Sequence, residues 1–78
     1  MTQPTLADCV RRQLEAYFAD LGGQPPAHLH AMLVKAVEAP LLEVVMERAG
    51  QNQSRAADWL GLNRNTLRKK LIEHQLID

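Results

Sequence analysis

The sequence has little of several residue types, and each shortage excludes a class of protein. Its 78 residues include a single cysteine, Cys9, which rules out an internal disulfide and fits a reducing compartment. The aromatic residues Tyr17, Phe18 and Trp59 make up only 4% of the chain, so its core must be aliphatic. A chain this short has little core of its own. We therefore expect one domain at most, and a dimer in which two chains share a core.

Signals for secretion, membrane insertion and catalysis are also missing. Met1 to Thr5 has no basic start and precedes no long apolar run, so no signal peptide is expected. Charged residues and Pro40 interrupt the central apolar segment before it could span a membrane. His28 and His30 point in different directions on a helix, and we expect no metal or other cofactor. Because no loop is able to form a pocket, an enzyme is not expected. We expect a bacterial-type cytoplasmic protein.

The charge of the chain is zero in total but uneven along its length. Residues 1–47 carry six acidic and three basic side chains, whereas residues 48–78 carry six basic and three acidic side chains. Summing over the chain hides this asymmetry. The basic C-terminal half is therefore where a polyanion would bind.

Hydrophobic periodicity and capping residues predict four helices and no strand. The first begins at about Leu6 after the cap Thr5 and ends at Gly22-Gly23. The second begins at Pro25-Pro26, because proline lacks an N–H that the first turn does not need. The later helices are predicted at Pro26–Ala49, Gln53–Leu60 after Asn52, and Arg64 to about His74 after Asn63. The fold class is all-α: one domain over 1–78, with a dimerisation core at about 5–49 and a helix-turn-helix at about 50–78.

The second predicted helix is unusually apolar. From Leu29 to Ala49, 14 of 21 residues are Ala, Val, Leu or Met. A helix on a small monomer buries one stripe rather than two thirds of its surface. We therefore expect this segment to be covered by the first helix and by a second subunit, with the polar face reduced to Lys35, Glu38, Glu43 and Glu47.

The last predicted helix has an apolar edge and a polar face. Leu67 and Leu71 form the buried edge, while Asn65, Thr66, Lys69 and Lys70 are expected on the opposite side, with Arg68 between them beside Arg64. A recognition helix points its N-terminal residues into the DNA major groove. Arg64 suits guanine and Asn63 suits a base or a phosphate. The phosphate-binding candidates are Ser54, Arg55, Thr66, Lys69 and Lys70.

These runs resemble a known family. Gln51–Ala57 and Gly61–Leu71, with Val37–Leu42 and Tyr17–Ala19 upstream, are similar to the Fis family of bacterial nucleoid-associated proteins over about residues 6–76. The resemblance implies an intertwined homodimer with a helix-turn-helix at each end, in the cytoplasm at the nucleoid. Its recognition helices would lie closer together than one DNA turn, so that binding bends the duplex and favours a deformable A/T-rich centre. It also implies modulation of transcription and DNA topology, with RNA polymerase as a further candidate partner.

The resemblance assigns roles by position. Asn63 and Arg64 match residues that approach bases, and Ser54 stands where the best-known member has threonine, which keeps the hydroxyl. Asn65 replaces a glycine of that member. Contact with recombinases is not expected, because only Met1 to Thr5 precede the first helix. The positions that match residues at or near phosphates are Asn52, Ser54, Arg55, Thr66, Arg68, Lys69 and Lys70.

Two other interpretations fit the residues. The chain could be the C-terminal domain of an NtrC-type enhancer-binding activator, whose partners include an ATPase domain and a specialised RNA polymerase. The initial Met1 and the upstream match favour a separate Fis-like protein. Alternatively, the chain could be a dimerisation or adaptor module whose basic face binds an acidic protein.

Overall fold

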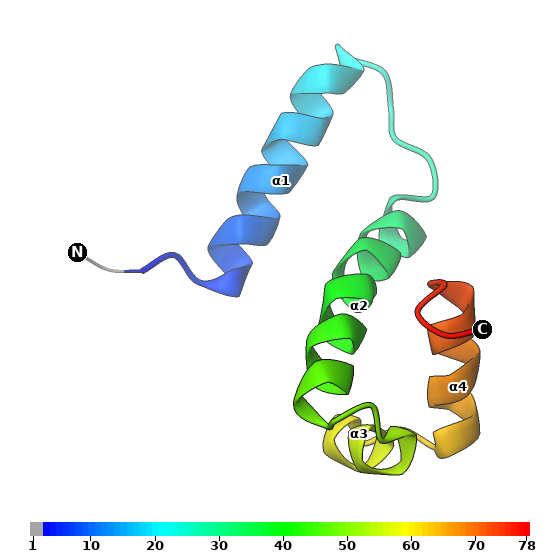
Figure 1. Cartoon of the computed structure of the whole chain (residues 1–78). Helices are drawn as coiled ribbons and strands as arrows, with labels where there is room; N and C mark the ends of the chain where they lie inside the picture. Colours follow the sequence, from blue (N-terminus) through cyan, green and yellow to red (C-terminus); the bar gives the residue numbers. More distant parts are fainter. Residues whose placement is uncertain (1–2) are drawn as a thin grey trace.

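The computed structural model describes residues 3–78, and within that range it contains four helices and no strand. They are α1 (Leu6–Leu21), α2 (Leu29–Arg48), α3 (Gln53–Leu60) and α4 (Arg64–Glu73) (Figure 1). The predicted all-α fold is confirmed. Met1 and Thr2, the first two residues of the Met1–Thr5 segment considered above, lie outside the described residues.

Helix α1 begins and ends as the sequence predicts. The Thr5 hydroxyl accepts a hydrogen bond from the Asp8 N–H at 3.1 Å, and the Asp8 carboxylate accepts one from the Thr5 N–H at 3.0 Å. This reciprocal pair is a capping box, which satisfies two backbone donors that the first turn leaves free. At the other end Gly22 adopts a left-handed conformation with φ 58°, which glycine reaches without a steric penalty.

Helix α2 begins later than predicted. Pro25 and Pro26 lie in the loop, and the first helical residue is Leu29. The residue before it, His28, has a φ of 54°, a left-handed conformation that cannot belong to a right-handed helix. The prediction that Pro25-Pro26 opens the helix is therefore wrong. Once begun, α2 continues through Pro40 to Arg48.

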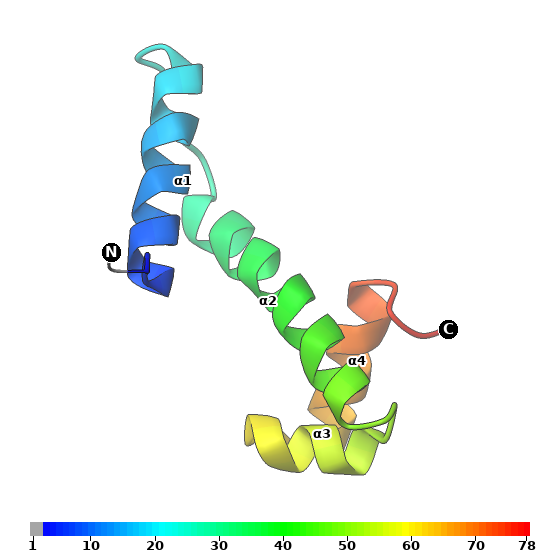
Figure 2. The ribbon, with the colours of Figure 1, turned by 60° about the vertical axis from the view of Figure 1, so that its left-hand side comes forward.

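The buried core joins the C-terminal part of α2 to α3 and α4. Figure 2 shows α3 crossing the lower end of α2 and α4 returning beside it. The small side chains Ala56 and Ala57 let α3 approach its neighbours closely, and Leu67 and Leu71 of α4 are fully buried. This arrangement fixes α4 against α2 through apolar contact. The buried residues are Leu42, Met46, Ala49, Ala56, Ala57, Leu67 and Leu71.

Helix α1 stands apart from this core. It buries no side chain, and Figures 1 and 2 show it projecting away from α3 and α4. An open apolar groove runs between α1 and α2, lined among others by Val10 and Leu14 from one side and by Leu41 and Val44 from the other. Val44 is 53% exposed. The expected covering of α2 by the first helix is therefore not found within one chain.

Truncating Leu71 should strongly destabilise the fold. Removing a fully buried leucine side chain and leaving a cavity costs about 2–5 kcal/mol, so Leu71→Ala is expected to lower the urea midpoint clearly. The matched control is Ile72→Ala on the same helix, because Ile72 is 46% exposed. Unfolding would be followed by circular dichroism at one protein concentration. Equal midpoints for the two variants would contradict the described core.

Candidate nucleic-acid interface

Helices α3 and α4 and the short turn between them form a helix-turn-helix. Gly61 ends α3 in a left-handed conformation with φ 72°, and the Leu62 N–H donates to the Ala57 carbonyl at 2.9 Å. These features end α3 within one residue and let α4 begin at Arg64 after only three intervening residues, 61–63. The turn therefore sets the angle at which α4 leaves the core.

Each helix of this motif is capped by an asparagine. The Asn52 side-chain oxygen accepts a hydrogen bond from the Arg55 N–H at 3.1 Å, and the Asn63 oxygen accepts one from the Asn65 N–H at 2.8 Å. Both predicted caps are confirmed. Because each oxygen serves the cap, the side-chain NH₂ group is the part of each asparagine that can donate to a phosphate or a base.

Most of the predicted contact residues lie on the surface of the motif. Leu67 is 0% exposed and marks the side of α4 that faces the core. The residues around the N-terminus of α4 and the first turn of α3 are exposed, as a surface that binds a macromolecule must be. Their contact with DNA stays a prediction. The exposed candidates are Asn52, Ser54, Arg55, Asn63, Arg64, Thr66, Arg68 and Lys69.

Lys70 does not lie where the sequence analysis placed it. It is half-buried, and its Nζ lies 2.8 Å from Glu38 Oε2 on α2. The assignment of Lys70 to the face opposite the leucines is wrong. Lys70 is three residues after Leu67, and residues three apart share one side of a helix. Its side chain therefore flanks the core and turns toward α2.

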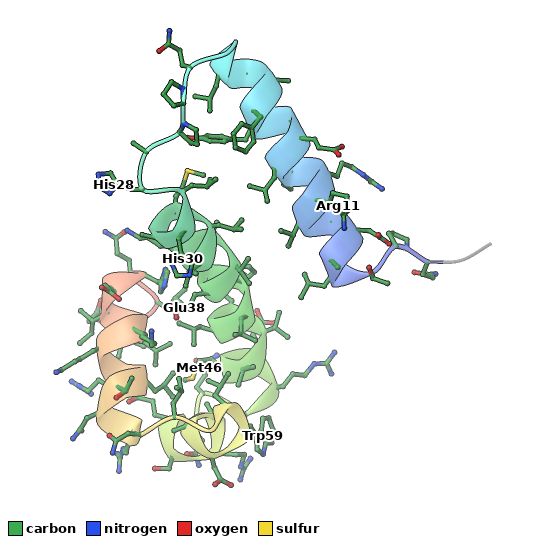
Figure 3. All side chains as sticks on the ribbon, turned by 180° about the vertical axis from the view of Figure 1, so that it is seen from behind. Arg11, His28, His30, Glu38, Met46 and Trp59 are labelled. Atoms are coloured by element: carbon green, nitrogen blue, oxygen red, sulfur yellow. The ribbon has the colours of Figure 1, made fainter. Side chains whose placement is uncertain are left out.

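Glu38 is the centre of an ionic cluster that links α2 to α4. Its second oxygen, Oε1, lies 2.9 Å from His74 Nε2, while Oε2 binds Lys70 (Figure 3 labels Glu38). The His74 side chain is 5% exposed and that of Glu38 is 19% exposed. Hydrogen bonds from Lys70 and then His74 hold the pKa of Glu38 below its ordinary value, and the Glu38 carboxylate raises the pKa of Lys70.

Comparison with known proteins gives a consistent result. The family described as "Bacterial regulatory protein, Fis family" matches residues 33–74, which is more than half of the chain. The chain belongs to the Fis family. A Fis-like DNA-binding protein of Ralstonia nicotianae is 51% identical over 99% of this chain and 100% of its own length. A Fis-like DNA-binding protein of Neisseria meningitidis is 54% identical over 97% of this chain and 96% of its own length.

A longer relative shows the same similarity. The DNA-binding protein Fis of Psychromonas ingrahamii is 49% identical over 95% of this chain and 75% of its own length. The resemblance read from the sequence is thereby confirmed. The match of the family to residues 33–74 includes α2 from its second turn onward, so it covers the segment that carries Glu38 as well as the helix-turn-helix.

The link from Glu38 to α4 was not predicted from the sequence of this Fis-family chain. Glu38 was grouped with the polar face of α2, and His74 was considered only as the approximate end of the last helix. Two spacings place the three residues near the core, because Glu38 lies four residues before the buried Leu42, and Lys70 and His74 each lie three residues after a buried leucine, Leu67 or Leu71. Residues three or four apart share a helix face. What no spacing shows is that these two faces meet.

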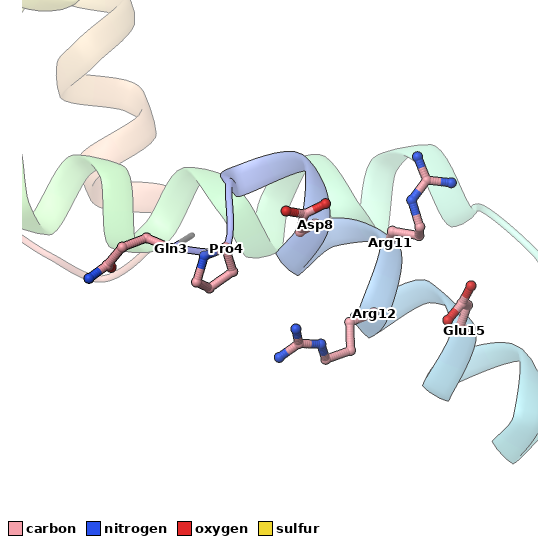
Figure 4. A pocket seen from close by; sticks show the side chains of 6 residues that line it. All are labelled: Gln3, Pro4, Asp8, Arg11, Arg12 and Glu15. Atoms are coloured by element: carbon pink, nitrogen blue, oxygen red, sulfur yellow. The ribbon is translucent and has the colours of Figure 1, made fainter. Parts of the chain in front are cut away.

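A separate hollow lies at the start of α1 in this Fis-family chain. Figure 4 shows a shallow hollow at the start of α1, lined by Asp8, Arg11, Arg12 and Glu15 among others. Its Asp8 carboxylate is occupied by the capping box, and the Thr5 N–H holds the pKa of Asp8 below its ordinary value.

Across residues 3–78 no group of three His, Cys, Asp or Glu side chains could hold a metal ion. In the same range no helix has both the length and the apolar character of a membrane span.

The Glu38 cluster should make stability depend on pH in acid. The pKa of Glu38 is lowered from an ordinary value of 4.5, so its contribution is complete above about pH 4.5 and is lost as pH falls through the lowered pKa. We therefore expect Glu38→Gln to lower the urea midpoint at pH 7 and to lower it progressively less as the pH falls below 4.5 toward 3. Glu43→Gln, at an exposed position of α2, is the control. A deficit in Glu38→Gln that is as large at pH 3 as at pH 7 would contradict the ionic cluster.

Proposed function

We propose that this protein is a homodimer that binds and bends double-stranded DNA in the cytoplasm, organises the nucleoid and regulates transcription. One observation carries the proposal. A helix-turn-helix with an exposed polar and basic surface is fixed to a helix, α2, whose other side is apolar and uncovered. The relatives are named as DNA-binding proteins, and these names support the DNA-binding part of the proposal.

The DNA contacts follow from the exposure of α4 and its cap. Arg64 is the first residue of α4, where a long side chain extends beyond the packed helices. Its guanidinium can offer two parallel donors to guanine, and the Asn63 amide can donate to a neighbouring base or phosphate. We assign the phosphates to Asn52, Ser54, Arg55, Thr66, Arg68 and Lys69, which have the residue types that position a protein on the duplex.

The second subunit is proposed from the groove between α1 and α2. Leu6, Leu41 and Val44 would leave their apolar side chains in water in a single chain, since each is about half exposed or more. Burying apolar surface is favourable by about 25 cal/mol per Å². A second copy presents the same apolar helices, so an interface that uses one patch on both subunits would cover both grooves at once.

Bending is inferred from the family. Helix-turn-helix dimers meet successive major grooves about 34–36 Å apart when the duplex is straight. The Fis-family resemblance implies recognition helices closer together than this, so the duplex must curve to reach both. Bending of this kind selects sequences by their deformability and not only by base contacts.

DNA binding is tested by fluorescence anisotropy on labelled duplexes of about 30 base pairs, with Arg64→Ala as the key variant. We expect tight, salt-sensitive binding that is stronger for a flexible A/T-rich centre than for a stiff G/C-rich one. Removing the guanine contact should cost about 1–3 kcal/mol on duplexes with end guanines and less on duplexes without them. Arg11→Ala on α1, which removes the same charge from an exposed position, is the control. If the wild-type protein bound neither duplex at low salt, an acidic protein partner would replace DNA as the ligand of the basic face.

Dimerisation is tested by placing a charge in the apolar groove. Val44→Asp should produce a monomer, because burying an unpaired carboxylate in an apolar interface is unfavourable by several kcal/mol. The measurement is molar mass by light scattering across a concentration series. Glu43→Asp, one residue earlier and already acidic, serves as the control. A dimeric mass for Val44→Asp at every concentration would remove the groove as the interface.

A further inference from the structure

The cluster around Glu38 lies at the edge of the core, where α2 and α4 meet. Glu38, Leu42 and Met46 are spaced four apart, so they form one continuous row along α2. The lower part of that row, Leu42 and Met46, lies in the apolar core. Glu38 lies one turn above it, at the edge of the core nearest to α1 in the chain.

Helix α4 presents a matching row. Leu67 and Leu71 enter the core, Lys70 flanks them on the side toward α2, and the C-cap His74 follows Leu71 by three residues. Helix α4 packs mainly on α3, which in turn packs on α2, so few contacts join α4 directly to α2. The contacts of Glu38, one turn beyond Leu42, add a direct attachment that restricts the direction of α4.

We propose that Glu38 is a positioning residue for DNA binding, which holds the angle between α2 and the recognition helix through its two contacts with α4. The proposal rests on the proposed function. In a dimer built on α1 and α2, that angle sets the separation and tilt of the two recognition helices. Small errors in it are doubled between the two ends of the DNA site, although each helix-turn-helix remains folded.

The chemistry of the cluster suits this role. Both carboxylate oxygens are engaged, Oε2 by the Lys70 ammonium at 2.8 Å and Oε1 by the His74 imidazole nitrogen at 2.9 Å. Because hydrogen bonds are directional, two of them restrict the orientation of α4 more closely than the non-directional apolar contacts do. His74 is almost fully covered and Lys70 is 31% exposed, so the cluster lies at the packed side of α4 and leaves the exposed face for DNA.

The test compares Glu38→Gln with Glu43→Gln on a long and a short duplex. Both variants lose one negative charge from α2, so their long-range attraction to DNA rises equally. On a duplex of about 30 base pairs, which both recognition helices can reach, we expect Glu38→Gln to bind about fivefold more weakly than Glu43→Gln, within the range of coupling between contacting side chains. On a hairpin duplex of about 8 base pairs at low salt, which is shorter than one DNA turn and admits one recognition helix, the two should bind within about twofold of each other.

The outcomes separate this proposal from its alternatives. Equal binding of the two variants on the long duplex overturns the positioning role. A weaker binding of Glu38→Gln that is the same on both duplexes also overturns it, because the cluster would then only maintain the local fold. If the wild-type protein binds neither duplex, the proposed function itself fails, and this proposal fails with it.

A second variant covers the case in which Glu38→Gln does not fold by circular dichroism. His74→Leu removes one of the two contacts and leaves Glu38 paired with Lys70. It fills the covered position with an apolar side chain of similar size. Wild type is its control, since the formal charge with neutral histidine is unchanged. We expect about twofold to threefold weaker binding on the long duplex only, as half of the coupling is lost. Binding equal to wild type on both duplexes would overturn the proposal.

Discussion

The placement of α4 on α2 is the constraint on which the rest of this structure depends. A few apolar side chains accomplish it: Leu42 and Met46 on one helix and Leu67 and Leu71 on the other, with the small residues of α3 filling the space between them. Because so little surface is buried, every additional contact between α2 and α4 has a large share in defining their angle. The Glu38 cluster is such a contact, and it extends the attachment by one helical turn.

Local chemistry made most of the fold predictable. Thr5, Asn52 and Asn63 were identified as caps because their side chains can accept from backbone N–H groups, and all three do so. The start of α2 was missed because it depends on the left-handed conformation of His28, a residue type that gives no reliable signal for it. Pro25 and Pro26 are compatible with a helix start, but they do not require one.

The candidate site was less predictable than the fold, for a physical reason. Exposure of Lys69 follows from its place on the helix opposite Leu67 and Leu71, and that of Arg64 follows from its position at the first residue of α4, beyond the packed region. The pairing of Lys70 with Glu38 joins residues on two helices whose relative placement depends on the turns at Gly50 and Gly61. A helical wheel describes one element at a time, so it can place Lys70 at the flank of α4 but cannot show what it faces.

The charge asymmetry of the chain has a structural counterpart at this contact. The acidic N-terminal half and the basic C-terminal half meet where Glu38 binds Lys70, so one basic side chain of α4 is neutralised by α2 and withdrawn from the exposed face. The exposed cations Arg64, Arg68 and Lys69 remain toward the N-terminal and outer parts of α4. Positive charge is thus concentrated on the side where a duplex would lie. The electrostatic potential at the surface therefore depends on ion pairing within the protein as well as on the number of basic residues in the motif.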